Sequence, residues 1–226
     1  MNYCKNLFKT EDGSMSFRIE KLNESYHSKN GALTESQFVY IQKGYSYWNE
    51  INKKGVCKIF EMGYGTGLNA YLSYLESKKH HSKTHYTSLE LFPLSVKEIA
   101  CLNYDKFFKT QKEILTFENF SKIEWEIDQD LSEHFTLLKK EFDFEKLEGT
   151  KNYDIIFYDA FGYNAQPELW STKNIQKCYD MLFSGGIWIS YCAKGSVRRA
   201  LEESGFQVER LPGPPGKREM LRALKV

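Results

Sequence analysis

Hydrophobic and polar positions recur with two different periods along the chain, and they predict where strands and helices lie. Runs rich in β-branched and aromatic residues predict strands, whereas apolar residues three to four positions apart predict helices. The expected strands are residues 16–22, 58–61, 85–91, 123–127, 153–161, 187–192, 206–211 and 220–224. The expected helices are residues 34–41, 68–75, 95–102, 105–119, 131–140, 168–183 and 196–204.

The order of these elements predicts the fold class. From residue 58 onward strands alternate with helices, which indicates a parallel sheet with helices on both faces. The run 153–161 (YDIIFYDAF) is apolar with little interruption, as in a central strand buried on both sides. The last two strands flank the turn PGPPGKRE and form a predicted antiparallel hairpin. We therefore expect an α/β, Rossmann-like class I methyltransferase fold in residues 53–226, with residues 1–52 as an extension packed on it.

A glycine-rich turn lies between the strand at 58–61 and the helix at 68–75. The stretch KIFEMGYGTGLN passes an acidic residue, Glu61, and then Gly63, Gly65 and Gly67. Glycines let a ligand approach the backbone, and the first N–H groups of the helix are free to bind it. The spacing differs from the dinucleotide fingerprint, and no Gly-Lys-Ser/Thr follows to hold phosphates. A nucleoside-like ligand without a phosphate cradle is expected, and S-adenosylmethionine is the obvious candidate.

Four predicted strands carry an acidic residue at or just beyond their carboxyl end. In open α/β sheets the ligand lies beyond these ends, where the strand order reverses. Glu90 is expected to accept hydrogen bonds from ribose hydroxyls, and Asp130 to lie near the adenine amine. Glu61 is expected to anchor the turn or face the cationic end of the cofactor, and Asp159 to lie where the methyl group is transferred. The alternative for each is a helix cap or a surface charge.

Composition limits the partners. The 226 residues are 41% hydrophobic and 15% aromatic, as in a globular protein with one sizeable core. The formal net charge of +1 gives no overall case for nucleic acid, so any such contact requires a local patch. Residues 194–226 are locally basic. Five cysteines without metal-ligand spacing, and the absence of an apolar run of about 20 residues, predict a cytoplasmic protein without metal or membrane span.

Five stretches of the sequence resemble a known family. They are YHSKNGALTES, FEMGYGTGLNAYL, HYTSLELFPL, YDIIFYDAFGYNAQPELW and GSVRRALEESGFQVERLPGPPGKREML. Together they make the chain resemble the methyltransferase component of bacterial tRNA 5-methylaminomethyl-2-thiouridine biosynthesis, the MnmC family. The similarity covers most of the chain. The oxidase half of the bifunctional members is not expected here, because the chain ends at Val226.

The resemblance implies a reaction, a partner and a set of site residues. The reaction is N-methylation of 5-aminomethyl(-2-thio)uridine at the tRNA wobble position by S-adenosylmethionine. The partner is the tRNA anticodon loop, with a functional link to the enzyme that supplies the 5-aminomethyl group. Asp159 is the implied catalytic residue. The cofactor residues expected on this basis are Glu61, Gly63, Gly65, Thr66, Gly67, Asn69, Glu90 and Asp130. The substrate residues expected are Tyr163, Trp170, Arg198, Lys217 and Arg218.

The expected chemistry requires little of the protein beyond positioning and proton removal. Only the neutral amine has a lone pair for attack on the methyl group, and Asp159 is suited to orient the amine and accept its proton. Two departures from the family pattern stand out: Gly162-Tyr163 replaces the usual Ala-Pro, and Gln129 replaces the glycine before Asp130. Two alternatives remain open. One is a methyltransferase of the same fold acting on a small-molecule or protein amine, and the other is a non-catalytic adenosyl-binding module that positions RNA.

Overall fold

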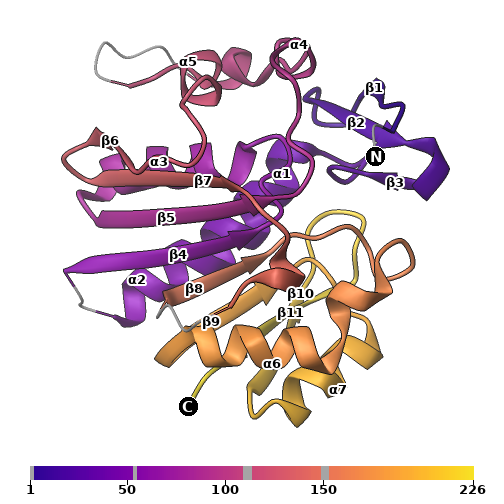
Figure 1. Ribbon diagram of the computed structural model, residues 1–226, viewed down its shortest axis with the longest axis vertical. Coiled ribbons are helices and arrows are strands. Elements are labelled where there is room, and N and C mark those ends of the chain that lie inside the picture. Colours follow the sequence, from indigo (N-terminus) through magenta and orange to yellow (C-terminus); the bar gives the residue numbers. More distant parts are fainter. Residues whose placement is uncertain (1–2, 53–54, 109–113, 149–152) are drawn as a thin grey trace.

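An eight-stranded sheet forms the centre of the protein (Figure 1). The computed structural model describes residues 3–52, 55–108, 114–148 and 153–226. In spatial order the strands are β10 (Gln207–Pro212), β11 (Glu219–Leu224), β9 (Leu182–Ser190), β8 (Tyr153–Tyr158), β4 (Val56–Met62), β5 (Lys83–Glu90), β7 (Phe135–Glu141) and β6 (Gln129–Ser132). The five strands from β9 to β7 are mutually parallel, whereas β6 and β11 run antiparallel to their neighbours. The predicted α/β class and the C-terminal hairpin are confirmed.

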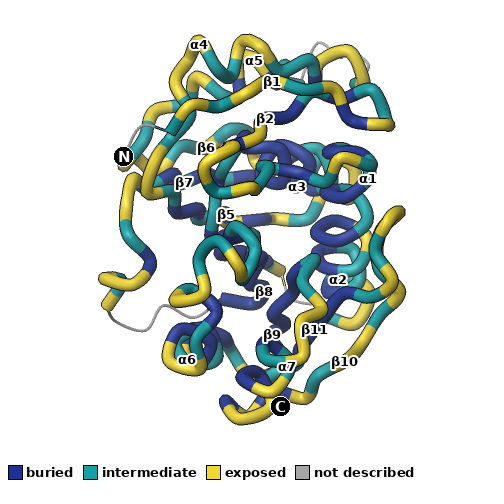
Figure 2. Tube along the Cα trace, turned by 90° about the vertical axis from the view of Figure 1, so that its right-hand side faces the viewer, coloured by how far each residue is buried: buried dark blue, intermediate teal, exposed yellow. Residues whose placement is uncertain are grey.

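Helical segments cover both faces of the sheet. One face carries α3 (Leu68–His80) and a helical segment made of α1 (Ala32–Ser36), η2 (Gln37–Ser46) and α2 (Tyr47–Ile51); the other carries α6 (Thr172–Met181) and α7 (Gly195–Glu203). The central strand β8 is buried throughout, as its continuous apolar run predicts (Figure 2). Ile155 and Phe157 point to the first face, and Ile156 and Tyr158 to the second. Within the described residues, no helix is both long and apolar enough to cross a membrane.

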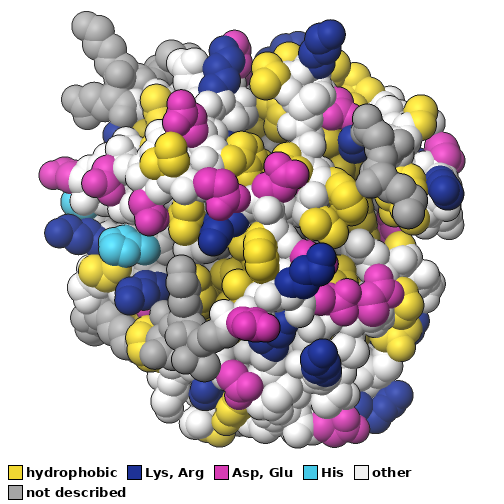
Figure 3. Space-filling model, viewed as in Figure 1, with side chains coloured by type: hydrophobic (Ala, Val, Ile, Leu, Met, Phe, Trp, Pro, Cys, Tyr) yellow, Lys and Arg dark blue, Asp and Glu magenta, His cyan; other side chains and the backbone are white. Residues whose placement is uncertain are grey.

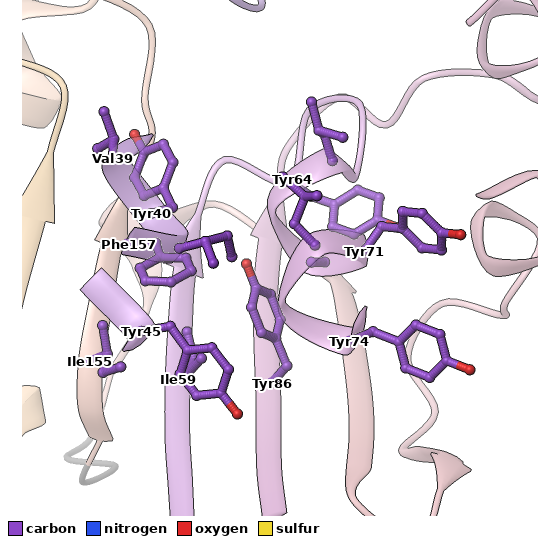
Figure 4. Packing of buried hydrophobic residues seen from close by; sticks show 14 of the residues in the cluster. Val39, Tyr40, Tyr45, Ile59, Tyr64, Tyr71, Tyr74, Tyr86, Ile155 and Phe157 are labelled. Atoms are coloured by element: carbon purple, nitrogen blue, oxygen red, sulfur yellow. The ribbon is translucent and has the colours of Figure 1, made fainter. Parts of the chain in front are cut away.

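The helical segment 32–51 is longer than the predicted helix 34–41, and its middle is wound more widely. Residues Gln37–Ser46 form a π-helix, a rare winding associated with functional sites. Its buried side chains include Tyr40 and Tyr45, and the Tyr40 ring lies 5.2 Å from that of Phe157 on β8 (Figure 4). The second half of the expected extension therefore packs as a layer of the sheet domain itself.

The first half of the extension forms a small separate sheet. Its strands are β1 (Asn6–Lys9), β2 (Met15–Ile19) and β3 (Glu24–Ser25), with η1 (Glu20–Leu22) between the last two. Asp12, in the turn between β1 and β2, accepts hydrogen bonds from Ser14 N at 3.0 Å and from Thr34 N at 2.9 Å. These bonds join the small sheet to the start of the helical segment. Burial raises the pKa of Asp12, but hydrogen bonds from the Ser14 and Thr10 hydroxyls and from these two N–H groups together lower it to about 2.

The segment between β5 and β8 departs most from the prediction. The expected strand 123–127 is wrong, since these residues form turns, and the expected helix 131–140 is wrong, since β6 and β7 form an antiparallel hairpin there. Phe135, Leu137 and Lys139 are buried in alternation, so the period of two prevails over the helical one. Of the predicted helix 105–119, residues 109–113 lie outside the described residues. The short helices between β5 and β8 are α4 (Val96–Ile99), η3 (Tyr104–Phe107), α5 (Phe117–Ser121) and η4 (Phe144–Lys146), and a further one, η5 (Pro167–Trp170), follows β8.

Phe157 tests the packing of the helical segment against the sheet. Its side chain is fully buried between the rings of Tyr40 and Tyr86. Replacing Phe157 by Ala is expected to lower the free energy of unfolding by about 3–5 kcal/mol, through lost burial and a residual cavity. Urea unfolding measures this change. Phe107, which is 42% exposed, provides the matched control, and an equal loss in Phe107→Ala would contradict the assignment.

Candidate functional site

The glycine turn after β4 lies where the strand order of the sheet reverses. Because β4 is hydrogen-bonded to β5 on one side and to β8 on the other, the chain leaves β4 between the two halves of the sheet. Gly63 has a φ of +93°, and a Cβ there would lie 2.5 Å from the carbonyl oxygen of Asp159. Gly67 has a φ of +81°, and a Cβ there would lie 2.6 Å from the Tyr64 hydroxyl. Glycine is therefore required at both positions by close packing.

A cleft of about 910 Å³ opens beside this turn, between the carboxyl ends of the parallel strands and the small N-terminal sheet. Seven of the predicted site residues line it: Gly63, Gly65, Thr66, Asn69, Glu90, Asp159 and Lys217. They come from the turn, from the first turn of α3, from the ends of β5 and β8, and from the turn of the C-terminal hairpin. The fold thus brings together residues that are as many as 154 positions apart (63 to 217) at one edge of the sheet.

The carboxyl group of Asp159 is held on both of its oxygens. The Tyr40 hydroxyl donates to Oδ1 at 2.6 Å, and the Asn69 side-chain amide donates to Oδ2 at 2.8 Å. Burial raises the pKa of Asp159 to about 7, and these two hydrogen bonds, which favour the charged form, offset burial only in part. A carboxyl group that titrates near neutrality is well matched to accept a proton from a substrate. The geometry defines a fixed proton acceptor at the wall of the cleft.

Glu90 is held by backbone N–H groups yet keeps acceptor capacity. Gly65 N donates to its Oε2 at 3.0 Å, and Phe92 N donates to its Oε1 at 2.9 Å. Each carboxylate oxygen accepts two hydrogen bonds, so Glu90 retains lone pairs for ribose hydroxyls in the cleft that it lines. Phe92 and Phe142 line the same part of the cleft and provide apolar surface for a base. A glycine turn, a free acceptor and apolar walls fit an adenosyl group.

The charge of the cleft favours a cationic ligand. Among the described residues that line it, carboxyl side chains outnumber lysines by eight to two. The eight are Glu24, Glu35, Glu90, Glu141, Asp143, Glu145, Asp159 and Glu168, and the two are Lys5 and Lys217. A sulfonium ion and a protonated alkylamine are both cations, and such a lining attracts them. It repels phosphate groups for the same reason.

Asp130 does not lie at this site. It belongs to the edge strand β6, opposite Thr136, whose hydroxyl donates to its carboxylate at 2.7 Å. Thr136 pairs with His85 near the amino end of β5. Asp130 therefore lies near the amino ends of the parallel strands, whereas the glycine turn lies at their carboxyl ends. The expectation was misplaced because the strand that precedes the cleft is β7, not residues 123–127. Three acidic residues at or after the end of β7 line the cleft: Glu141, Asp143 and Glu145.

Of the five expected substrate residues, all of them described, Lys217 alone lines the cleft. Trp170 is buried, and its indole N–H donates to the Phe161 carbonyl at 2.9 Å, so it supports the loop after Asp159 instead of presenting a stacking surface. The Tyr163 ring lies under the Lys194 ammonium, 3.8 Å from the ring centroid. Arg198 is paired with Glu202 on the same helix at 2.5 Å. Arg218 is exposed in the hairpin turn.

The N-terminal extension contributes site residues that the sequence analysis did not assign. Tyr40 holds Asp159. Glu35, 7% exposed, accepts from Lys217 Nζ at 2.7 Å and from Ser28 N at 2.8 Å. The buried His27 ring shares a hydrogen bond with the Thr66 hydroxyl at 2.8 Å, and burial lowers the pKa of His27 to about 4. The stretch YHSKNGALTES was a signal for two of these residues, but no strand end or glycine turn marked them as functional.

The fold and site together define a Rossmann-like methyltransferase. Four features are typical of that class. They are the strand order, the glycine turn after β4, the acidic residue at the end of β5, and the antiparallel β11 between β9 and β10. The profile of the S-adenosyl-L-methionine-dependent methyltransferase family matches residues 110–226, and the chain belongs to this family. S-adenosyl-L-methionine is therefore its cofactor. Gly63, Gly65 and Glu90 line the cleft, and we propose that they hold it.

The chain is also similar to particular proteins. It is 30% identical over 217 residues to the tRNA 5-methylaminomethyl-2-thiouridine biosynthesis bifunctional protein MnmC of Leptospira interrogans, covering 89% of this chain and 32% of that protein. The protein of the same name from Campylobacter hominis is 31% identical over 215 residues, covering 90% and 30%. The chain thus spans about a third of the length of these relatives. The crystal structure of MNMC2 from Aquifex aeolicus shares the fold, with a TM-score of 0.76 at 21% identity, covering 100% of this chain and 71% of that one.

Asp159 gives the stability of the protein a specific pH dependence. Its pKa is about 7 in the folded protein against an ordinary value of 3.8, so the folded state binds more protons than the unfolded state between these values. Stability attributable to this group therefore falls as pH rises from about 4 to about 7. Replacing Asp159 by Asn removes the effect, and the variant is expected to gain stability relative to wild type as pH rises. Urea unfolding at several pH values measures this, with the exposed Asp180→Asn as control; a pH-independent difference would contradict the assignment.

Proposed function

We propose that the protein transfers a methyl group from S-adenosyl-L-methionine to the amine of 5-aminomethyl(-2-thio)uridine at the wobble position of tRNA. The observation that carries the proposal is the Asp159 carboxyl group, fixed by Tyr40 and Asn69 at the wall of an acidic cleft beside the glycine turn. The relatives named for 5-methylaminomethyl-2-thiouridine biosynthesis support the same nucleoside. The reaction class follows from the family.

The residues of the cleft supply positioning and proton removal. When bound, the cofactor provides an electrophilic methyl group on a cationic sulfur. Asp159 would accept the proton that the amine loses, which would leave the nitrogen lone pair free to take up the methyl group in exchange for its bond to sulfur. A pKa near 7 lets Asp159 accept that proton at neutral pH without being mostly protonated beforehand. The hydrogen bonds from Tyr40 and Asn69 keep the accepting oxygens in place, which contributes through orientation.

The acidic cleft requires the RNA backbone to be bound elsewhere. Four exposed basic side chains of the C-terminal segment have no carboxylate partner in the described part of the chain: Lys194, Arg199, Arg210 and Arg218. Two of them follow β9 or lie in the hairpin turn, at the edge of the sheet that holds the cleft. On the face in Figure 3, which includes α6 and α7, basic and acidic side chains are interspersed. We assign phosphate contact to the C-terminal segment, while the cationic aminomethyl group enters the cleft.

Transfer of labelled methyl groups tests the proposed reaction. The protein is incubated with labelled S-adenosyl-L-methionine and tRNA that carries 5-aminomethyluridine, and the nucleosides are analysed by mass spectrometry. Label is expected in 5-methylaminomethyl nucleosides, and none in tRNA that lacks the aminomethyl group. Asp159→Asn is expected to reduce single-turnover methylation by about 100-fold or more, within the range of a lost general base.

Other outcomes of this experiment would support one of the two alternative functions or exclude Asp159 from proton transfer. Methylation of a small-molecule or protein amine without methylation of tRNA would show that this amine, and not tRNA, is the substrate. Binding of both cofactor and tRNA without turnover on the verified substrate would leave a non-catalytic adenosyl-binding module. An unchanged rate in Asp159→Asn would remove this residue from proton transfer.

Salt dependence tests the assignment of the RNA-binding segment. Replacing Arg199 and Arg218 by Gln together is expected to weaken tRNA binding and to reduce the slope of log affinity against log salt by roughly 1–2, because two phosphate contacts are lost. The rate at saturating tRNA should be unchanged. Lys79→Gln with Lys122→Gln removes the same charge from exposed positions on another part of the surface. An equal effect in this control pair would show that overall charge, and not this segment, governs binding.

A further inference from the structure

The part of the cleft around Asp159 offers a ligand several hydrogen-bond acceptors. Glu24 and Glu35 line the cleft together with Asp159. Glu61, which the sequence analysis expected to anchor the turn or to face the cationic end of the cofactor, is not among the described residues that line it. Glu61 is fully buried and accepts a hydrogen bond from the Ser88 hydroxyl at 2.6 Å. Carboxyl oxygens suit the amine of the substrate, but the uracil ring also carries a carbonyl oxygen at C4, which needs a donor.

Lys217 has donors to spare, whereas two donors nearer to Asp159 are already in use. The Asn69 amide donates to Asp159 itself at 2.8 Å, and the Tyr191 hydroxyl donates to the carbonyl of the residue after Asp159, also at 2.8 Å. The Lys217 ammonium group carries three N–H donors, and one of them donates to Glu35 Oε1 at 2.7 Å. The Lys217 side chain lines the cleft and is 30% exposed. It can therefore donate to a ligand without giving up this partner.

Lys217 and Asp159 are anchored to the same helical segment. Glu35 accepts from the Lys217 ammonium group, and Tyr40, five positions later, donates to the Asp159 carboxyl group at 2.6 Å. Tyr191 joins the two a second time. Its ring centroid lies 3.8 Å from Lys217 Nζ, and its hydroxyl bonds the residue next to Asp159. The two shared supports fix the ammonium group relative to the carboxyl group.

The backbone that carries Lys217 is held in place as well. Lys217 N donates to the Pro214 carbonyl at 2.9 Å, which closes the turn between β10 and β11 (Figure 1). The Asn30 side chain donates to the Pro215 carbonyl at 3.1 Å, which attaches this turn to the N-terminal extension. Gly216 has a φ of +83°, and a Cβ there would lie 1.6 Å from Asn30 Nδ2, so the contact requires glycine. A group presented from such a turn loses little freedom when it binds a ligand.

We propose that Lys217 is a specificity-determining residue that donates a hydrogen bond to O4 of the uracil ring and thereby selects uridine over cytidine. The inference rests on the proposed function. In 5-aminomethyluridine, O4 and the aminomethyl group are carried by adjacent ring carbons, so the groups that bind them must be held close together, as Lys217 and Asp159 are by their shared supports. Cytidine carries an amino group instead of O4, and its N–H donors would meet the donors of the ammonium group.

Two matched substrates measure this preference. They are anticodon stem-loops that differ only in carrying 5-aminomethyluridine or 5-aminomethylcytidine at the wobble position, and methylation is followed with labelled S-adenosyl-L-methionine. Wild type is expected to favour the uridine in kcat/KM by roughly 10- to 100-fold, the effect of one charge-assisted hydrogen bond. Lys217→Gln, whose amide has both a donor and an acceptor, is expected to bring the ratio to within about threefold of 1. Both substrates meet the same protein preparation, so the ratio does not depend on the folded fraction.

Glu35→Gln is the control for the ion pair. It removes the charge opposite Lys217 and leaves the ammonium group, so the preference is expected to stay within about threefold of wild type. An equal loss of preference in Glu35→Gln would show that Lys217 acts only by supporting the fold. A wild type without preference, or a Lys217→Gln variant with the wild-type ratio, would overturn the inference and leave the proposed reaction standing. A wild type that methylates neither stem-loop would overturn the proposed function, and the inference with it.

Discussion

The hydrogen bond from Tyr40 to Asp159 is the contact on which the site depends. It joins the end of the central strand β8 to a π-wound turn of the helical segment, and Asn69 of α3 completes the cage from a third element. The carboxyl group gains two donors but loses water, and loss of water has the larger effect on its pKa. The Asp159 carboxyl group keeps this position only while β8, α3 and the helical segment remain packed together. The core beneath, in which the Tyr40 ring lies against Phe157, therefore helps to hold the proposed proton acceptor in place.

The glycine turn and the acceptor are physically one unit. Gly63 approaches the backbone of Asp159 so closely that no side chain fits between them. The glycine turn and Asp159 are thereby kept at a fixed separation. The small N-terminal sheet fixes the turn from the other side through His27 and Thr66, and the hairpin turn is fixed through Lys217 and Glu35. Polar contacts that are buried or half-buried thus connect the N-terminal extension to the glycine turn and to the turn of the C-terminal hairpin.

The sequence predicts the parts of this site that depend on local chemistry. The strand, turn and helix around Gly63, the buried strand that ends at Asp159, and the role of Glu90 as an acceptor follow from residue type and spacing. The β6–β7 hairpin does not, because a run such as FTLLKK suits either period until its neighbours are known. The misplaced Asp130 follows from that ambiguity. The role of Tyr40 could not be predicted for another reason: the helical period of the sequence does not indicate the π-helix in which Tyr40 lies, and its partner Asp159 is 119 positions away in the sequence.

The polar contacts between the N-terminal extension and the turn of the C-terminal hairpin have a consequence for how the cleft is assembled. Lys217 donates a hydrogen bond to Glu35, Asn30 donates one to the Pro215 carbonyl, and β11 is inserted between β9 and β10. A nascent chain that has emerged only as far as β9 has the glycine turn and Asp159 but lacks the side of the cleft that carries Lys217. The glycine turn and Asp159 alone therefore do not make a complete cleft, because its other side is formed by residues that come after β9 in the sequence.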